Sequence, residues 1–391
     1  MLDKGSIDKV KKVVRKSIEK NEIAGGNLMV IKEGKEIFYY EDGFADREAG
    51  LPIRRDSIFR LYSMSKPITA AAVMILLERG EIDLYDPVSQ FLDGFKNQMV
   101  CENEWLEPVD REVTLKDLLS MTSGLVYGGD DRAGQETMAL FQEIDNRLLG
   151  DSPMGTVEAM NKLGRNALAF QPGTSFQYGT SADVLGAVVE VVSGKRFGDF
   201  LKEELFEPLK MWDTGFWLPE EKRDRLVKTY EDNNDGDLML YTGNHLGIVH
   251  QMDRDPAFES GGAGLVSTID DYAKFARMLM NDGSLDGVQI LRPQTVKYLT
   301  SGTLNTVQQE GLDAWFTLSG YSYGNLMRVM TDCSKAGGLG SHGEYGWDGW
   351  LGAYFCNCPK DDVTFLFMMQ KKDSGTTALT RKLRNIILSS L

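Results

Sequence analysis

The feature that most constrains the fold is the apolar segment "KPITAAAVMILLERGEIDL", which begins at Lys66. Its apolar residues recur at the spacing of a helix, and Gly80 provides a stop signal after them. Pro67 fits the first helical turn, where the N–H group that proline lacks would have no partner inside the helix. The segment is apolar around most of its circumference, so it predicts a helix buried at the centre of the protein. At 391 residues, the chain is long enough for two or three structural units.

Apolar strands near both ends of the chain predict one antiparallel sheet. The segment "GGNLMVIKEGKEIFYYEDGFAD" predicts a hairpin that turns at Lys32–Lys35. Strands at Ala353–Cys358 and Val363–Gln370 predict a second hairpin. An amphipathic helix is predicted before the first hairpin, and another helix from about Thr376 onward. Because antiparallel hairpins can join in one sheet, we expect the two terminal helices to cover it.

The middle of the chain has a different character. Helical stripes of apolar residues, separated by glycines and prolines, dominate residues 86–264. We therefore expect an α/β (α+β) fold made of two parts. Residues 1–85 and 265–391 would form a discontinuous α/β domain, and residues 86–264 an inserted, mostly helical subdomain. The active site would lie between the two parts.

The charge balance argues against nucleic acids and membrane surfaces as partners. The sequence has 43 basic and 58 acidic residues, a net charge of −15. Phosphate backbones and anionic membranes repel such a chain, and no basic stripe offsets the negative charge. No apolar run reaches the roughly 18 residues of a membrane-spanning helix. The N-terminal residues lack the apolar core and cleavage site of a secretory signal, so we expect a cytoplasmic protein.

The four cysteines are Cys101, Cys333, Cys356 and Cys358. Only the last two are close in sequence, and on a strand a Cys-x-Cys pair points both side chains to one face. The sequence has no second pair that would complete a zinc site. We therefore expect free thiols in a reducing compartment, with no bound metal and no organic cofactor.

The stretch "RLYSMSKPIT" places Ser63 and Lys66 at the start of the predicted central helix. Residues three apart on a helix share a face, so the two side chains can touch. A serine hydroxyl becomes a nucleophile when a base takes its proton, and a buried lysine at the positive end of a helix can be that base. The alternative is a helix capped by Ser63 or Ser65, with the lysine at the surface. The same pattern at Ser6–Lys9 and Ser17–Lys20 lies among solvated charges and is expected to be structural.

Three further segments bear on these alternatives. "LLSMTSGL" begins at Leu118, "FQPGTSFQYGTSADVLGAVVEVVSGK" places Tyr178 in a loop before an apolar helix, and "GGAGLVSTIDDYAKFARML" begins at Gly261. Together with "SMSK", this ordered set resembles the serine β-lactamase and penicillin-binding-protein superfamily. The likeness is closest to class C β-lactamases and the related family VIII carboxylesterases. It extends from about Gly26 to Gln370 and implies a β-lactamase/transpeptidase-like fold.

The resemblance implies roles for individual residues. Ser63 would be the nucleophile that becomes acylated, Lys66 its base partner and Tyr178 the second proton-transfer group. The backbone N–H groups of Ser63 and Trp350 would form the oxyanion hole. The reaction would be acyl transfer through an ester on Ser63, followed by attack of water.

The third motif of the family, Lys-Thr-Gly, has no literal copy. Its best match is "WDGWLG", Trp347–Gly352, which resembles the Trp-Gly-Gly-x-x-Gly form of the esterases. In this register Trp347 would line the pocket as an apolar contact, and Gly349 would let the backbone approach the substrate closely. A register that placed His342 at the strand edge would lack the glycine spacing.

Two departures from the family pattern favour esters over β-lactams. Thr180 stands where β-lactamases have an asparagine that donates to the β-lactam side chain. Trp347 stands where a lysine or histidine helps to hold the β-lactam carboxylate. We therefore expect a serine hydrolase of carboxylic esters or small amides. Tyr127, after "TSGL", is a further candidate to face the pocket, and Asp348 adds a charge whose effect the residues leave open.

Other interpretations stay open from the residues alone. A β-lactamase, or a D-amino-acid peptidase or amidase of the same superfamily, is the nearest alternative. A Ser-His-Asp hydrolase could use His245, His250 or His342, although the sequence has no Gly-x-Ser-x-Gly motif. A non-catalytic sensor that keeps the fold is the alternative from another class.

Two features complete the prediction of the site. Tyr323-Gly324-Asn325 satisfies the Tyr-x-Asn motif literally, but its strand-like surroundings predict a place in the core or in a hairpin. The loops Asn97–Pro108 and Leu304–Phe316 are expected to shape the pocket. The acyl group, the leaving group, the acceptor (water or an alcohol) and the oligomeric state stay open.

Overall fold

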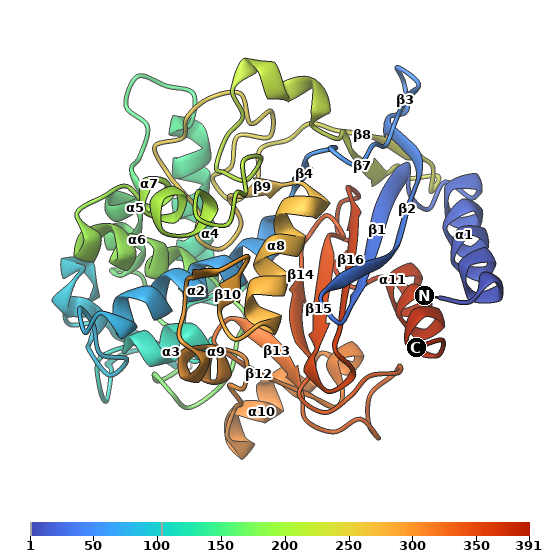
Figure 1. Cartoon of the computed structure of the whole chain (residues 1–391). Coiled ribbons are helices and arrows are strands. Elements are labelled where there is room, and N and C mark those ends of the chain that lie inside the picture. Colours follow the sequence, from blue (N-terminus) through green and yellow to red (C-terminus); the bar gives the residue numbers. More distant parts are fainter. Residues whose placement is uncertain (1, 103–104) are drawn as a thin grey trace.

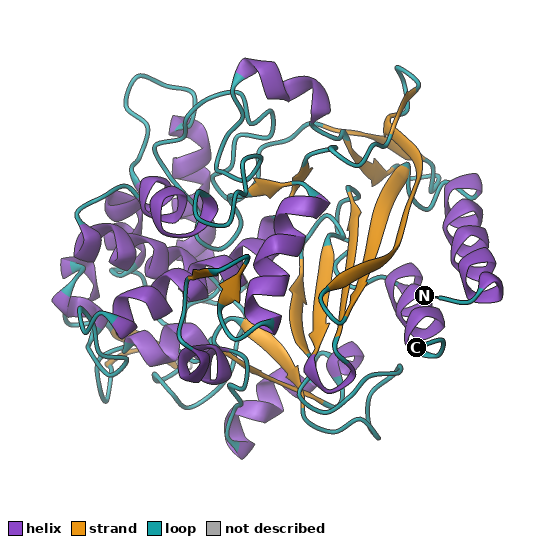
Figure 2. Ribbon diagram, viewed as in Figure 1, coloured by secondary structure: helices purple, strands orange, loops and turns teal. Residues whose placement is uncertain are grey.

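An antiparallel sheet lies between the two terminal helices and a larger group of helices (Figures 1 and 2). The computed structural model describes residues 2–102 and 105–391. The sheet has eight strands in the spatial order β12-β13-β14-β15-β16-β1-β2-β3. Their bounds are β12 Tyr321–Gly324, β13 Met327–Met330, β14 Tyr345–Asp348, β15 Tyr354–Cys358, β16 Val363–Met369, β1 Gly25–Lys32, β2 Lys35–Asp46 and β3 Leu51–Pro52.

The two predicted hairpins meet at the centre of this sheet. Strand β1 pairs with β2 on one side and with β16 on the other, so Met29 lies opposite both Tyr39 and Leu366. Every residue of β1 up to Ile31 is buried, because helices cover both faces of the sheet. The prediction of one antiparallel sheet joined from both ends of the chain is confirmed.

Two layers of helices cover the sheet. The terminal helices α1 (Lys4–Glu19) and α11 (Ala378–Leu388) pack against each other on one face, near the two chain ends (Figure 1). Helix α8 (Ile269–Met280) lies on the other face and contacts β1, β15 and β16. The Thr268 side chain accepts a hydrogen bond from the Asp271 N–H and caps α8. The prediction that the two terminal helices, α1 and α11, cover the sheet is confirmed.

The predicted central helix is α2 (Ser65–Glu78). Every residue of α2 from Ser65 to Leu76 is buried, and the helix packs against α6 (Ser181–Ser193) and α9 (Pro293–Leu299). Pro67 is the third residue of α2, inside the first turn as predicted.

The remaining helices and the short strand pairs lie outside the eight-stranded sheet. The other helices are α3 Leu115–Ser120, α4 Arg132–Arg147, α5 Thr156–Leu163, α7 Phe197–Leu201 and α10 Thr306–Asp313. The short pairs are β4 Phe59–Arg60 with β9 Val266–Ser267, β5 Met99–Glu102 with β6 Trp105–Pro108, β7 Thr229–Asp232 with β8 Leu238–Tyr241, and β10 Ser284–Leu285 with β11 Val288–Gln289.

The division into two domains stays a prediction. Helices α3 to α7 all fall within residues 86–264, whereas β7 in the same range lies beside the main sheet. There the Tyr230 N–H donates to the Gln370 carbonyl at 3.1 Å. Of the helices that the structure describes, none combines the length and the apolar character needed to cross a bilayer.

Candidate active site

Ser63 lies in the turn that leads into the central helix. Residues Tyr62–Met64 form a 3₁₀ turn, η1, directly before α2. Tyr62 has φ +45°, in the left-handed region that costs a residue with a side chain about 1–2 kcal/mol. No side chain caps α2, and Ser65 Oγ instead accepts a hydrogen bond from the Leu265 N–H at 3.1 Å. The alternative in which Ser63 or Ser65 caps this helix is therefore wrong.

Lys66 is fully buried, and its amine lies next to Ser63. Lys66 Nζ is 3.2 Å from Ser63 Oγ, 2.9 Å from Tyr127 Oη and 2.8 Å from the Gly262 carbonyl oxygen. A neutral amine has two N–H donors and one lone pair. If the donors serve Tyr127 and Gly262, the lone pair is left to accept the proton of the Ser63 hydroxyl. The alternative with a surface lysine is excluded by this burial.

Burial also sets the proton affinity of this amine. It lowers the pKa of Lys66 to about 7, while the negative charges of Asp183 and Asp348 act to raise it. Asp183, in α6, accepts hydrogen bonds from Ser260 Oγ at 2.5 Å and from the Gly262 N–H at 3.0 Å. These bonds fix the carbonyl group that Lys66 contacts. A lysine with this pKa can be deprotonated near neutral pH, as a general base requires.

Tyr178 lies just before α6, on the other side of the amine. Lys66 Nζ is 4.6 Å from the centre of its ring. Burial raises the pKa of Tyr178, while contacts with Ser63 and Trp347 lower it. The phenol therefore keeps its proton at neutral pH and can donate it. Trp347, which is buried, donates from Nε1 to Tyr178 Oη at 2.9 Å and also lines the cavity beside Ser63. Its apolar contact with the substrate stays a prediction.

The two predicted oxyanion donors border one cavity. Among the described residues, the backbone N–H groups of Ser63 and Trp350 have no hydrogen-bond acceptor, and both residues line the same hollow. A Cβ atom at Gly349 would lie 2.2 Å from the Leu61 carbonyl oxygen. Glycine is needed here so that the end of β14 can pack against the chain that leads to Ser63. The predicted close approach of this backbone to the substrate stays a prediction.

Tyr127 and Thr180 lie behind the cavity. The Tyr127 hydroxyl contacts Lys66, as described above, and burial raises the pKa of this phenol well above its usual value. Thr180 has no exposed surface, and its hydroxyl lies 3.5 Å from the Val126 carbonyl oxygen. The structure therefore places Tyr127 against the amine and Thr180 in the packing below the pocket.

The literal Tyr-x-Asn motif lies in a hairpin, as predicted. Tyr323 belongs to β12, which pairs with β13, and has no exposed surface. Its ring centre is 5.0 Å from that of Trp347 and 6.5 Å from that of Tyr178. Tyr323 therefore supports the site from behind and does not face the cavity.

No histidine of the described chain hydrogen-bonds Ser63. His245 stacks on Trp350 with ring centres 4.3 Å apart. Burial lowers the pKa of His250 to about 3, helped by the charges of Arg60 and Lys228, and His342 lies in the turn before β14. The geometry therefore does not support a Ser-His mechanism.

The cavity next to Ser63 has a volume of about 440 Å³. Tyr178, Trp347 and Trp350 line it, and Trp315 adds a further aromatic side chain. Trp315 belongs to the predicted loop Leu304–Phe316, which contains α10 and shapes the pocket as expected. In the other loop, Asn97–Pro108, residues 103–104 lie outside the described residues, and the described ones do not line this cavity.

Asp348, whose effect the residues left open, lies at the edge of the cavity. Its carboxylate accepts a hydrogen bond from Thr376 Oγ1. Burial raises the pKa of Asp348, and the charges of Arg328 and Lys66 lower it. Asp348 thus anchors the segment before α11 to the end of β14. Sequence reasoning missed Asp183, although an acidic residue inside the apolar run "SADVLGAVVEVV" was a usable signal.

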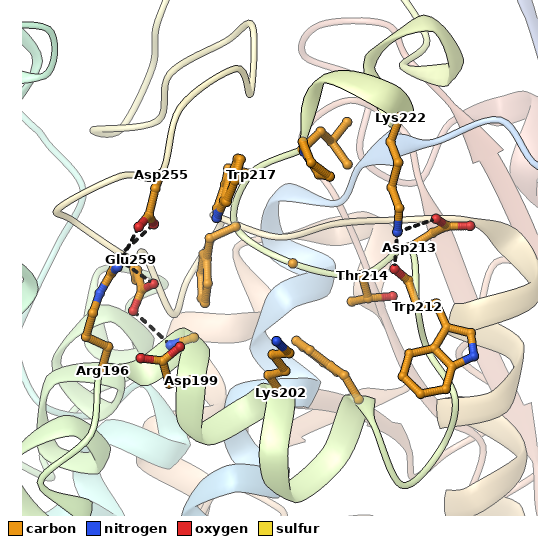
Figure 3. A pocket seen from close by; sticks show the side chains of 16 residues that line it. Arg196, Asp199, Lys202, Trp212, Asp213, Thr214, Trp217, Lys222, Asp255 and Glu259 are labelled. Carbon is orange, nitrogen blue, oxygen red and sulfur yellow. Dashed lines mark hydrogen bonds and ion pairs between the residues drawn. The ribbon is translucent and has the colours of Figure 1, made fainter.

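A second cavity, of about 360 Å³, lies beside α7 (Figure 3). Its lining does not include Ser63, Lys66 or Tyr178. Several of its charged groups pair with one another: Arg196 with Asp255 and Glu259, and Lys222 with Asp213. The charges within these pairs compensate one another, so the pairs do not indicate a bound ligand.

One buried group of possible metal ligands occurs in the part of the chain that the structure describes: Glu344, Cys356 and Cys358. Arg384 Nη2 already donates to Glu344 at 2.6 Å, so a positive charge is present there without a metal ion. All four cysteines are free thiols, as predicted.

Comparison with known proteins assigns the family. The β-lactamase family pattern matches residues 10–388, nearly the whole chain. The chain belongs to the β-lactamase family. The esterase EstB of Burkholderia gladioli is 31% identical over 354 residues, which cover 87% of this chain and 84% of EstB. The predicted family is confirmed.

Two further comparisons cover most of the chain. An uncharacterised protein of Mycobacterium tuberculosis is 30% identical over 369 residues, 91% of this β-lactamase-family chain and 88% of its own. The structure of EstCE1, described as a hydrolase with promiscuous acyltransferase activity, matches with a TM-score of 0.82. It covers 98% of both chains at 24% identity. The predicted fold class is therefore confirmed.

The bond between Trp347 and Tyr178 predicts a measurable effect. We expect Trp347→Phe to lower kcat about threefold to tenfold, because the indole N–H that would stabilise negative charge on the Tyr178 oxygen in the transition state is lost. We expect His342→Ala to leave kcat nearly unchanged. Steady-state kinetics of both variants from pH 5 to 10 with p-nitrophenyl butyrate would check this. A loss of turnover in His342→Ala would contradict the assignment of Trp347, and not His342, to the site.

Proposed function

We propose that the chain hydrolyses carboxylic esters or small amides through an acyl-enzyme on Ser63. The observation that carries the proposal is the buried Lys66 amine, 3.2 Å from Ser63 Oγ and with a pKa lowered to about 7. The esterase EstB among the relatives supports a serine hydrolase. A β-lactamase, or a D-amino-acid peptidase or amidase, is the alternative within the family.

In the proposed first step, Lys66 takes the proton of Ser63 while Oγ attacks the ester carbonyl. Tyr178, which keeps its proton at neutral pH, donates to the leaving alkoxide. Water then attacks the acyl group on Ser63. The Tyr178 oxygen takes a proton from this water, and Lys66 returns its proton to Ser63 Oγ. Trp347 stabilises the Tyr178 oxygen when it carries negative charge, because the indole N–H already points at it.

The N–H groups of Ser63 and Trp350 would hold the negative charge that develops on the carbonyl oxygen. Loss of one such donor typically costs about 3–4 kcal/mol in the transition state. Tyr127 would position the Lys66 amine through its hydroxyl. The site would lie between the predicted α/β and helical parts of the chain. A cytoplasmic location and the absence of nucleic-acid partners stay predictions from the sequence.

A chromogenic ester separates this proposal from a non-catalytic sensor. An esterase releases many equivalents of p-nitrophenol per protein from p-nitrophenyl butyrate, whereas a sensor releases at most one. Release that stops at one equivalent would contradict the proposed function.

The same pocket predicts a preference for esters over β-lactams. Among the described residues, its lining includes no lysine or arginine to hold a β-lactam carboxylate. Each charge-assisted bond that is lost costs about 1.5–3 kcal/mol. We expect kcat/KM for p-nitrophenyl butyrate to exceed that for a cephalosporin by at least about a hundredfold, two such bonds being absent. A cephalosporin that is the better substrate would favour the β-lactamase alternative.

A further inference from the structure

Aromatic rings form one continuous wall of the cavity beside Ser63. The ring centres of Tyr178 and Trp315 are 5.4 Å apart, and those of Trp315 and Trp347 are 6.5 Å apart with nearly parallel planes. Trp315 is 42% exposed, so part of its surface is open to a bound molecule. Trp350 lines the same cavity. The faces of such rings carry partial negative charge and attract cations.

The charged residues of the lining are acidic. Asp373 and Asp348 are the two charged side chains there, apart from the groups that act on Ser63. Asp373 is exposed, accepts a hydrogen bond from Trp350 Nε1 at 2.6 Å, and has no ion pair with a basic residue in the described chain. Its carboxylate is therefore available to a ligand at the rim of the cavity.

The two lysines that precede Asp373 in the chain are engaged elsewhere. Lys371 pairs with Asp232 at 2.9 Å, and Lys372 pairs with Glu231 at 2.7 Å. Both pairs join the end of the sheet to β7 and hold these amines on acidic partners. The cavity thus combines exposed aromatic surface with an unpaired carboxylate and lacks a lining cation.

We propose that this pocket selects esters that carry an ammonium group, quaternary or protonated, in the acyl or the alcohol part. The proposal rests on the proposed ester hydrolysis at Ser63. The ammonium group would lie on the open surface of Trp315 and face the Asp373 carboxylate. An aromatic surface and a carboxylate together attract a cation, and this attraction does not depend on hydrogen bonds from the cation. An acidic substrate would meet the same carboxylate and be disfavoured.

Two pairs of isosteric esters test this proposal. The first pair is butyrylcholine and the butyrate ester in which a tert-butyl group replaces trimethylammonium. The second pair is the p-nitrophenyl ester of γ-(trimethylammonio)butyrate and its tert-butyl analogue. Each pair differs in charge and little in shape, and the two pairs place the charge in the alcohol or in the acyl part. The measured quantity is the ratio of kcat/KM for the cationic ester to that for its neutral partner.

We expect a ratio of about ten in at least one pair, from a cation on an exposed ring and one partly exposed carboxylate. The ratio should fall as salt is raised, because exposed charges are screened. Asp373→Asn and Trp315→Leu should each lower the ratio several-fold. Asp235→Asn changes the net charge equally in the exposed β7–β8 turn and should leave the ratio as it is.

A ratio of one or less in both pairs would overturn the proposal. In that case turnover of the neutral esters would show that ester hydrolysis itself stands. If none of the four esters is hydrolysed and a fluorophosphonate does not label Ser63, the proposed function fails, and the substrate class fails with it.

Discussion

Ser63→Ala is expected to lower ester hydrolysis by about a thousandfold or more, as deletion of a nucleophile does in other serine hydrolases. The structure places the hydroxyl of Ser63 3.2 Å from the buried Lys66 amine. The same variant should lose labelling by a fluorophosphonate, which adds one equivalent to the native protein. Peptide mass mapping of the labelled protein would locate the adduct.

Ser17→Ala is the matched control, since Ser17 also begins a Ser-x-x-Lys pattern. Its hydroxyl donates to Glu22 at 2.7 Å on helix α1, away from any buried lysine. The Ser17→Ala variant should keep both labelling and turnover. An active Ser63→Ala protein, or an adduct on Ser17, would contradict the assignment.

Lys66→Met is expected to lower kcat/KM by about 10²–10⁴-fold, the usual contribution of a general base. Methionine has a similar length and fits the buried channel without leaving an unpaired charge. Lys66→Arg should not restore the rate, because a guanidinium stays protonated and cannot take the Ser63 proton. Circular dichroism would confirm that both variants fold.

The pH dependence of the native protein gives a second readout of Lys66. Because burial lowers the pKa of Lys66 to about 7, and because the deprotonated amine is the active form, kcat/KM should rise as the pH increases through about 7. This rise should be absent in the residual activity of Lys66→Met. A rate that falls over the same range would contradict the role of Lys66 as a base.

The sheet and the central helix could be predicted because their signals are local. The strand pairs at both ends follow from apolar runs and turns, and α2 follows from a segment that is apolar all round. Ser63 and Lys66 share one helix start, so their contact also follows from spacing in the sequence. The resemblance to β-lactamases supplied Tyr178, which the residues alone could not have placed.

Contacts between distant segments could not be predicted in this way. The Lys66 amine meets Tyr127 and Gly262, which lie 61 and 196 residues away along the chain. The hydrogen bond from Trp347 to Tyr178 spans 169 residues, so no local pattern indicated that Trp347 acts as a donor. Thr180 was expected at the pocket surface, but the packing of α6 buries it. Each of these features depends on how α2, α6 and β14 meet in space.

The most direct test of the account is to trap the acyl-enzyme. Protein mixed with p-nitrophenyl butyrate, quenched in acid during turnover and measured by intact mass, should carry one butyryl group per chain. Peptide mapping should place that group on Ser63, and Ser63→Ala protein treated in the same way should carry none. A butyryl group on another side chain, or hydrolysis that proceeds with equal rate in Ser63→Ala, would contradict the central claim that Ser63 is the nucleophile.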